Sequence, residues 1–494
     1  MRNNLLSIEQ GESIAMAPSA VSPTNGTQPN GDAFNHIDFT TFKNIINGEL
    51  KTTKAKRHGI NPATKEPNWE VPIATKQDVD NAVQAAQNAF TAWSATSIQE
   101  RREALDHFAD ALMEYKDDFS KLLTTEQGKP IHLARGEVDD GFTWLKEISK
   151  LTVPEEVVID NDERQVITRY TPLGVVVGIV PWNFPIQLAC GKIAPAIMTG
   201  NTIIIKPSPF TPYCDLKIAE LAQRFFPPGV IQALSGDDDL GPMLTSHPGV
   251  NKISFTGSTA TGKKVMESAS QTLKRVTLEL GGNDPAIICG DVNIATVAPE
   301  IARLAFLNSG QICLALKRIY VHESIYPEFR DTIVEMTKKM KAGDGFEDGV
   351  FLGPVQNKMQ YDRVKMFFDD IEKEGQKIAV GGISNNSSGY FITPTIIDDP
   401  KEDSKIVTEE QFGPIVPLLS WSTEDEVVTR ANHTKMGLGA SVWSSDLTTA
   451  RRIARRLEAG NVWVNSHLEV TPLAAFGGHK ESGIGMVPLN ATII

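Results

Sequence analysis

The spacing of apolar residues divides the chain into a helical first part and a second part built from short apolar runs. Between residues 78 and 93, and again from Ile98 to Leu123, apolar side chains recur every three or four positions. That period predicts two amphipathic helices, the second of them long and continuous. From Val175 onward short β-branched runs appear, each followed by turn residues and a helix-like stretch. This pattern predicts strands that alternate with helices.

The short apolar runs fall into two sets along the chain. The first set consists of VVVGIV (175–180), TIIIK (202–206), VIQAL (230–234) and KISFT (252–256). The second set follows Glu279 and consists of PAIIC, RIYVH, ASVWS and NVWVN. Strands that alternate with helices pair in parallel, because each helix carries the chain back across the sheet. The sequence therefore predicts an α/β fold with parallel sheets.

The N-terminal segment differs in composition from the rest. Residues 11–32 are rich in Ser, Pro, Asn and Gly, which predicts a disordered tail over residues 1–38. The segment lacks the continuous apolar core of a signal peptide, and Glu9 and Glu12 are atypical of a mitochondrial presequence. Four cysteines are too few for a disulfide framework, so we expect a reducing compartment, the cytoplasm.

Charge and composition argue against several classes of partner. The net charge of −13 disfavours a nucleic-acid ligand, because phosphate binding needs a basic face. No apolar run approaches the roughly 20 residues that span a bilayer, so we expect no membrane partner. The cysteines and histidines show no metal-binding or haem-attachment spacing, so we expect no metal.

A glycine-rich segment, FTGSTATGKK (255–264), follows one predicted strand and begins a predicted helix. Gly257 and Gly262 have the spacing of the phosphate loop G-x-x-x-x-G-K-[ST]. However, Lys264 occupies the position whose hydroxyl would bind Mg²⁺, which disfavours a P-loop phosphotransferase. Two interpretations stay open from the residues alone. The segment is an anion site at a helix N-terminus, or it is a tight turn between strand and helix.

Three further segments place chemically useful side chains at or near the ends of predicted strands. PWNFP (181–185) holds Asn183 between two prolines, and LELGGNDP (278–285) places Glu279 before two glycines. NSGQICLA (308–315) places Cys313 after a glycine turn. Ligands of open α/β sheets bind at the carboxyl ends of strands, which makes all three candidates. Each also has a structural explanation on its own: a rigid loop, an edge carboxylate and a buried thiol.

Taken together, the motifs resemble the aldehyde dehydrogenase family. PWNFP, KPSPFTP, FTGSTATG, LELGG, GQIC, EEQFGP and FGGHKESG occur in family order between about Ile45 and Gly485. The resemblance implies a Rossmann-like cofactor domain, an α/β catalytic domain and a small β-hairpin that bridges subunits. It implies a cofactor domain over 40–153 and 175–288, a hairpin over 154–174 and a catalytic domain over 289–485.

The resemblance also implies the reaction, which is NAD(P)-dependent oxidation of an aldehyde to the free carboxylic acid. Cys313 resembles the family nucleophile, which forms a thiohemiacetal and then a thioester. Asn183, with the backbone N–H of Cys313, resembles the oxyanion hole. Glu279 resembles the general base that activates water to hydrolyse the thioester.

Further positions carry over to the cofactor and to the substrate. The implied cofactor-binding residues are Lys206, Ser208, Gly257, Ser258, Gly262, Leu280, Glu410 and Phe412. The implied substrate-tunnel residues are Phe184, Gln187, Leu188, Gly191, Leu307, Ile312, Leu314 and Phe476. Because this tunnel is mostly apolar and has no evident arginine, we expect a bulky, aromatic or aliphatic aldehyde and not a dicarboxylic semialdehyde.

Two departures from the family pattern bear on cofactor and assembly. Pro209 stands where many NAD-preferring members have Glu, so either NAD or NADP is expected. Residues 486–494 form an atypically short C-terminus, where members normally add a strand to an inter-subunit sheet. The family implies a homodimer or homotetramer, and the short end counts against it. It also leaves open a catalytically impaired structural or binding protein, although the retained Cys313, Glu279 and Asn183 argue for an enzyme.

The remaining cysteines are predicted to be structural. Cys190 lies in an apolar helical stretch and Cys289 ends an apolar strand, so both should be buried and unreactive. Cys214 lies near a predicted helix start, and we expect it to be partly reactive.

Overall fold

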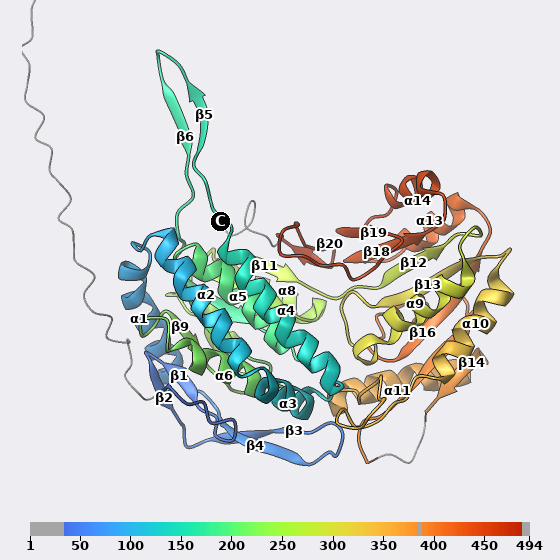
Figure 1. Ribbon diagram of the computed structural model, residues 1–494, viewed down its shortest axis with the longest axis horizontal. Coiled ribbons are helices and arrows are strands. Elements are labelled where there is room, and N and C mark those ends of the chain that lie inside the picture. Colours follow the sequence, from blue (N-terminus) through green and yellow to red (C-terminus); the bar gives the residue numbers. More distant parts are fainter. Residues whose placement is uncertain (1–33, 384–387, 487–494) are drawn as a thin grey trace, which may run out of the picture.

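The computed structural model describes residues 34–383 and 388–486, and it shows two α/β lobes, each built on its own sheet (Figure 1). The predicted tail lies outside the described residues as far as residue 33, and so does the C-terminal segment from residue 487. Phe34 and Ile37 are buried, so packed structure begins before the expected start near Phe39.

The first sheet has eight strands in the order β2-β1-β9-β8-β7-β10-β11-β21. The five strands from β9 to β11 are parallel, whereas β1, β2 and β21 pair antiparallel at the edges. The strand bounds are β1 Asn44–Ile46, β2 Glu49–Lys51, β7 Val175–Ile179, β8 Thr202–Lys206, β9 Ile231–Ala233, β10 Lys252–Thr256, β11 Arg275–Glu279 and β21 Gly483–Ile484.

Helices cover both faces of the first sheet. Helices α2 to α6 contribute buried side chains to the core on one face, and α1, α7 and α8 contribute to the core on the other. Ile203 and Ile205 of β8 enter the first core and Ile204 enters the second, as the alternation of side chains along a strand requires. The helix bounds are α1 Lys76–Trp93, α2 Ile98–Glu114, α3 Lys116–Gln127, α4 Ile131–Ser149, α5 Pro185–Met198, α6 Tyr213–Ala222, α7 Leu240–Ser246 and α8 Thr259–Ser270.

The second sheet has seven strands in the order β14-β15-β16-β13-β12-β18-β19, all parallel except the β14–β15 pair. Its strands are β12 Asp284–Ile288, β13 Leu316–His322, β14 Lys377–Gly382, β15 Thr393–Asp398, β16 Ile415–Trp421, β18 Gly439–Trp443 and β19 Asn461–Val464. Two helices pack on one face and four on the other: α9 Ile294–Phe306 and α10 Tyr326–Lys338, then α11 Lys358–Lys373, α12 Lys405–Thr408, α13 Glu424–Asn432 and α14 Leu447–Ala454.

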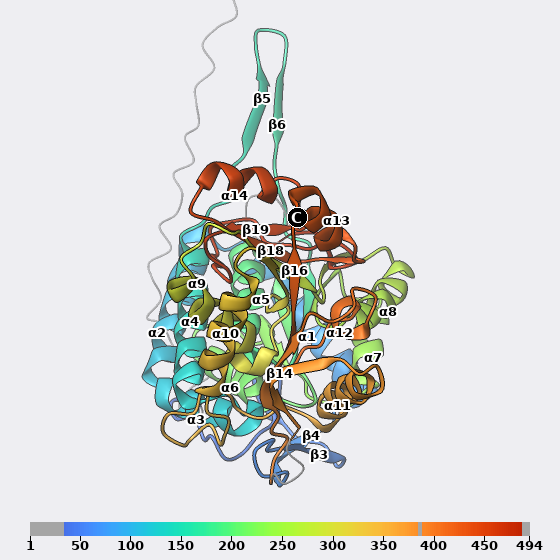
Figure 2. The ribbon, with the colours of Figure 1, turned by 90° about the vertical axis from the view of Figure 1, so that its right-hand side faces the viewer.

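A long β-hairpin stands away from both lobes. Strands β5 (Glu156–Asp160) and β6 (Gln165–Thr168) pair antiparallel and project from the body in both views (Figures 1 and 2). The hairpin lies within the predicted range of 154–174. Two other small pairs complete the fold: β3 (Lys56–Ile60) with β4 (Pro67–Pro72), and β17 (Met436–Gly437) with β20 (His479–Lys480).

The α/β fold predicted from the sequence is confirmed, and several strands match the expected residue ranges. TIIIK and KISFT coincide with β8 and β10, and the four apolar runs after Glu279 coincide with β12, β13, β18 and β19 to within two residues. The single helix expected from Ile98 to Leu123 is wrong. The chain leaves the helical region at Tyr115, with φ −104° and ψ 19°, and α3 begins at the next residue. The apolar period continues across this break, so the sequence pattern conceals it.

The division into domains differs from the expected boundaries in two places. Strand β12 pairs with β13 and β18, so the chain enters the second sheet after Glu279 and not after residue 288. Near the C-terminal end, β21 pairs with β11 and thus returns to the first sheet. The β11 strand and its Glu279 therefore lie between β10, which comes shortly before them in the chain, and β21, which comes about 200 residues later.

Candidate active site

Cys313 follows a strained turn at the start of the second sheet. Asn308, Ser309 and Gly310 have φ values of 50°, 58° and 69°, which is a short left-handed segment. This conformation costs residues with a side chain about 1–2 kcal/mol each. The turn is buried, and the Ser309 hydroxyl donates to the Gly353 carbonyl over 2.7 Å. Such strain persists only where surrounding structure imposes it, and it is concentrated at functional sites.

The four thiols differ in access to solvent. Cys313 is partly exposed, whereas Cys190, Cys214 and Cys289 are buried. The expectation that Cys214 is partly reactive is wrong. It lies fully buried at the start of α6, its Sγ is 3.9 Å from the Phe119 carbonyl oxygen, and burial raises the pKa of its thiol well above the ordinary value. A helix start activates a thiol only where solvent and reagents reach it.

Glu279, the last residue of β11, faces Cys313 across the two lobes. Burial raises the pKa of the Glu279 carboxyl, while a hydrogen bond from the Cys313 thiol and the positive charge of Lys192 oppose that shift. The pKa of the Cys313 thiol is raised well above its usual range by burial and then by the negative Glu279, and Lys317 is the cation that opposes the shift. The pair is thus a neutral thiol beside a proton acceptor.

Asn183 lies between the strand β7 and the helix α5, directly beside the Cys313 loop. Its side chain is buried, and its Nδ2 donates to the Gln311 carbonyl over 3.0 Å. Its own carbonyl accepts from Lys129 Nζ at 3.0 Å and from Asn308 Nδ2 at 3.3 Å. Because an amide nitrogen carries two hydrogens, one stays available after the bond to Gln311 is made. The geometry suits a fixed donor next to the thiol.

The predicted cofactor residues of the first lobe follow β8 and β10. Lys206 ends β8, its Nζ donates to the Pro207 carbonyl over 3.1 Å, and burial lowers the pKa of its ammonium to about 8. Ser208 follows it and is buried. After β10, the N–H of Gly257 donates to the Glu279 carbonyl over 3.1 Å, which joins this loop to the proposed base.

The start of α8 has the features of an anion site. Ser258 is the N-cap, and its hydroxyl accepts from the N–H of Thr261 over 3.3 Å. Gly262 packs against Leu280 so closely that a Cβ there would collide with the leucine side chain. Glycine at this position brings the helix N-terminus close to the end of β11. A dinucleotide pyrophosphate fits such a terminus, because its free N–H groups and its dipole favour negative charge.

Glu410 and Phe412 come from the loop between α12 and β16 in the second lobe. Glu410 Oε1 accepts from the N–H of Gly282 over 3.1 Å, and a Cβ on Gly281 would collide with this carboxylate. The Phe412 ring meets Trp182 edge to face at 5.2 Å, and its backbone is left-handed with φ 47°. The two lobes therefore meet where the glycines after Glu279 contact the EEQFGP loop.

The structure brings together five of the eight predicted tunnel residues. One apolar cluster contains Cys313 with Phe184, Leu307, Ile312, Leu314 and Phe476. The other three lie along α5: Leu188 packs against the core under α2 to α6, a Cβ added to Gly191 would lie 3.5 Å from the Trp144 ring, and Gln187 donates its N–H to Glu137. Nothing in the apolar spacing of α5 distinguishes the side that faces Cys313 from the side that faces α4.

Several residues of this region were missed by sequence reasoning. Trp463 of β19, with Leu468 and Val470 after that strand, joins the cluster around Cys313. Ser482 accepts the N–H of Leu280 with its carbonyl over 2.9 Å and donates its hydroxyl to the Gly281 carbonyl, which holds the glycines after Glu279. Two buried lysines, Lys129 and Lys317, were also missed. The one available signal was the charged pair that begins the otherwise apolar run KRIYV.

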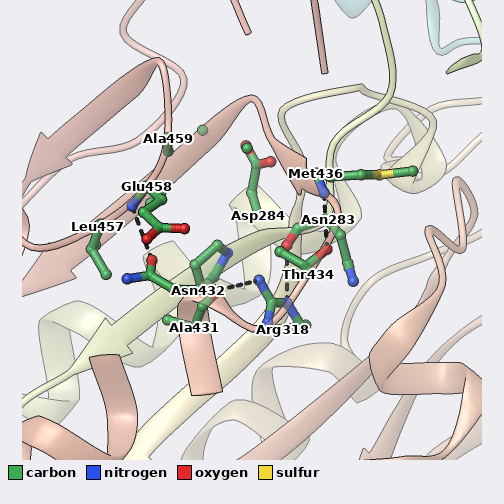
Figure 3. A pocket seen from close by; sticks show the side chains of 14 residues that line it. Asn283, Asp284, Arg318, Ala431, Asn432, Thr434, Met436, Leu457, Glu458 and Ala459 are labelled. Carbon is green, nitrogen blue, oxygen red and sulfur yellow. Dashed lines mark hydrogen bonds between the residues drawn. The ribbon is translucent and has the colours of Figure 1, made fainter. Parts of the chain in front are cut away.

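A separate small cavity lies beside β12, beneath the loop that follows α13 (Figure 3). It is lined by Asp284, Arg318, Asn432 and Met436 among others, and its volume of about 10 Å³ is the space of one water molecule. None of the predicted site residues lines it. Burial raises the pKa of Asp284 to about 7, and Lys317 is the cation that most opposes this shift.

A sequence model described as the aldehyde dehydrogenase family matches residues 50–492. The chain belongs to this family. Aldehyde dehydrogenase LUC3 from a Fusarium species is 45% identical over 450-odd residues, covering 91% of this chain and 96% of that protein. The family assignment made from the seven motifs is thus confirmed, and the enzyme is an aldehyde dehydrogenase.

Solved structures of relatives agree in fold. Betaine aldehyde dehydrogenase from Staphylococcus aureus, solved in complex with NAD⁺, has a TM-score of 0.87 and 32% identity, covering 90% of this chain and 92% of that one. An Escherichia coli enzyme described as NADP dependent has a TM-score of 0.88 and 33% identity, covering 91% and 95%. Within the described residues of the present enzyme, no helix is long and apolar enough to cross a membrane.

Proposed function

We propose that this aldehyde dehydrogenase oxidises a bulky, aromatic or aliphatic aldehyde to the free carboxylic acid, with NAD or NADP, through Cys313. The observation that carries the proposal is the meeting of Cys313, Glu279 and Asn183 at the junction of the two lobes. In the first step the Cys313 proton passes to Glu279, and the sulfur forms a bond to the aldehyde carbon. The product is a thiohemiacetal whose oxygen carries the negative charge.

Asn183 and the N–H of Cys313 stabilise that charge. The Gln311 and Lys129 contacts fix the asparagine in place before the reaction, so no reorganisation is needed when the charge develops. The bound nicotinamide supplies the acceptor for the hydride that leaves the thiohemiacetal carbon. Cys313 then holds a thioester.

Glu279 completes the reaction as a general base. After the hydride has left, Glu279 releases to solvent the proton that it took from Cys313. It then takes a proton from water as the water oxygen attacks the thioester carbon, and it returns that proton to the Cys313 sulfur as the sulfur leaves. The raised pKa of the Glu279 carboxyl matches this role, because a stronger base removes the proton more readily. The acid leaves as the free carboxylate, and the thiol regains its starting state.

The cofactor proposal rests on residues from both lobes. Lys206 and Ser208 at the end of β8 would hold the adenosine ribose, and Ser258 at the start of α8 the pyrophosphate. Gly257, Gly262 and Leu280 shape the cleft, and Glu410 with Phe412 would hold the nicotinamide ribose and ring. The absence of a carboxylate at Pro209 removes one repulsion toward a 2′-phosphate, so NAD and NADP are both retained.

The choice of substrate follows from the side chains around Cys313. They are apolar or aromatic, and the two nearby buried cations are already engaged. Lys129 pairs with Glu137 and the Asn183 carbonyl, and Lys317 binds two carbonyls. Neither is free to bind a second carboxylate, which disfavours a dicarboxylic semialdehyde.

The proposal includes assembly and location. The hairpin exposes the apolar side chains of Val157, Val158, Val166 and Ile167. An exposed apolar patch of this kind is typical of a surface that another subunit covers, so a homodimer or homotetramer is expected. All four cysteines are free, as a cytoplasmic enzyme would keep them.

The experiment is a comparison of kcat/KM for benzaldehyde, a long aliphatic aldehyde and succinic semialdehyde, each with NAD⁺ and with NADP⁺. We expect NAD(P)H absorbance to grow with the first two substrates and much less with the third. A preference for the semialdehyde would refute the substrate class. Growth with none of a wide aldehyde panel would favour a catalytically impaired protein instead.

A further inference from the structure

Lys317 is a buried cation that contacts both halves of the candidate active site. It is the second residue of β13, and its side chain is only 2% exposed. Its Nζ donates to the Ile312 carbonyl over 2.8 Å and to the Cys313 carbonyl over 2.6 Å, and it lies 3.4 Å from Glu410 Oε1. The three hydrogens of an ammonium are thus directed at three acceptors.

The contacts of Lys317 join two loops, one that carries the nucleophile and one that is predicted to bind the cofactor. The carbonyls belong to the segment that presents the nucleophile, directly after the left-handed turn. Glu410 belongs to the loop that would hold the nicotinamide ribose, and its second anchor is the Gly282 N–H. A single side chain therefore fixes the distance between the two loops.

Lys317 lies close to two buried carboxyls. The carboxyls of Glu410 and Asp284 both have this lysine as the first of the cations that lower their pKa. Without it, each of these two buried carboxyls would lose the cation that most lowers its pKa. Removal of the lysine charge from such a buried cluster leaves the negative charge of the carboxylates without compensation.

We propose that Lys317 is a positioning residue that couples the nucleophile loop to the cofactor-binding loop, through the Cys313 carbonyl on one side and Glu410 on the other. The proposal rests on the roles given above to Cys313 and Glu410. It predicts that Lys317 affects cofactor affinity and thiol reactivity together, although it touches neither cofactor nor substrate.

The test is Lys317→Met, which keeps the length of the stem and removes the charge. We expect the Kd for NADH, measured by fluorescence titration, to rise about 10- to 100-fold, because a hydrogen-bonded charge contributes on that scale. We also expect iodoacetamide to alkylate Cys313 more slowly at a given pH, with the pH profile moved to higher pH, because a cation near the thiolate has gone.

Two controls separate coupling from loss of stability. Lys217 is equally buried in the first lobe, where its Nζ donates to the Thr41 carbonyl over 2.6 Å and pairs with Glu220. Lys217→Met should lower Tm without changing either readout. Lys317→Arg, which keeps the charge, should recover part of the NADH affinity.

A double-mutant cycle with Glu410→Gln tests the connection itself. If Lys317 acts through Glu410, the combined variant should bind NADH about as weakly as the weaker single variant. Additive losses, or a Lys317→Met variant that matches Lys217→Met in NADH affinity and alkylation, would overturn the proposal. Failure of the proposed function is distinguishable, because it would appear in the wild type as no aldehyde-dependent NAD(P)H formation.

Discussion

Cys313 and Cys214 both place a thiol beside a carboxylate, and their surroundings differ in what else is present. Glu279 faces Cys313, and Glu126 accepts the N–H of Cys214 over 3.0 Å. Burial and the neighbouring carboxylate raise the pKa of both thiols well above the ordinary value. An acidic neighbour therefore does not mark the nucleophile.

The difference lies in access and in the positive groups nearby. Cys313 is partly exposed, lies after a left-handed turn, and has Lys317 and the Asn183 amide close to it. Cys214 is enclosed in α6, and the charged groups with the largest influence on its pKa are carboxylates. A catalytic thiol needs an opening, a donor for the developing oxyanion and some stabilisation of the thiolate.

The largest expected effect separates the two thiols directly. Cys313→Ala should lower kcat/KM by about 10³–10⁴-fold or more, because the covalent route is closed. Cys313→Ser should be nearly as poor, since a hydroxyl hardly ionises at neutral pH. Cys214→Ala should keep its activity and lose only stability. Steady-state rates measure the activity of each variant, and peptide mapping after iodoacetamide treatment shows which thiol reacts. Inactivation that follows labelling of Cys214 would make Cys214, and not Cys313, the nucleophile.

The next effect separates the two carboxylates. Glu279→Gln should release one equivalent of NAD(P)H in a burst and then turn over about 10²–10⁴-fold more slowly, because hydrolysis lacks its base. Glu126→Gln is the matched variant: Gln keeps an acceptor for one of the Tyr213 and Cys214 N–H groups and loses the other, so it should lower Tm but turn over normally. Stopped-flow absorbance resolves the burst. Normal steady-state turnover in Glu279→Gln would place the base elsewhere.

A smaller effect is expected at the oxyanion donor. Asn183→Ala should lower kcat by about 10²–10³-fold while NADH affinity stays unchanged, because the donor acts on charge that exists only in the transition state. Asn201 is an equally buried asparagine that holds the N–H groups of Leu173 and Gly174 away from the site. Asn201→Ala should affect Tm and leave kcat intact. Similar losses of kcat in both variants would assign Asn183 a purely structural role.

The smallest effect is a shift of a pH profile. Because the pKa of the Cys313 thiol is raised, its alkylation by iodoacetamide in the absence of cofactor should keep rising above the ordinary thiol pKa of about 8.5. Glu279→Gln removes a negative charge, which should lower the thiol pKa and move the profile to lower pH. Glu126→Gln should leave it in place. A profile unmoved by Glu279→Gln would show that the carboxylate does not face the thiol.

Sequence reasoning was strongest where local pattern and burial agree. β8 and β10 are buried along both faces, so continuous β-branched runs marked them fully. Prediction from the sequence failed where tertiary contacts override the local spacing of apolar residues. The helix break at Tyr115 leaves the apolar spacing intact, and β12 follows β11 so closely that the change of sheet is invisible. The strands β14, β15 and β16 were not identified at all.

The sequence by itself determined which residues have the chemistry: a cysteine after a glycine turn, a glutamate before two glycines and an asparagine between prolines, in a recognisable order. Only the tertiary structure decided that they meet. Glu279 ends one strand of the first sheet, Asn183 follows another, and Cys313 precedes a strand of the second sheet. The buried lysines that hold the loops, and the burial that separates Cys313 from Cys214, depend on contacts between segments far apart in the chain. No local pattern encodes such contacts, because burial and charge compensation are properties of the packed molecule.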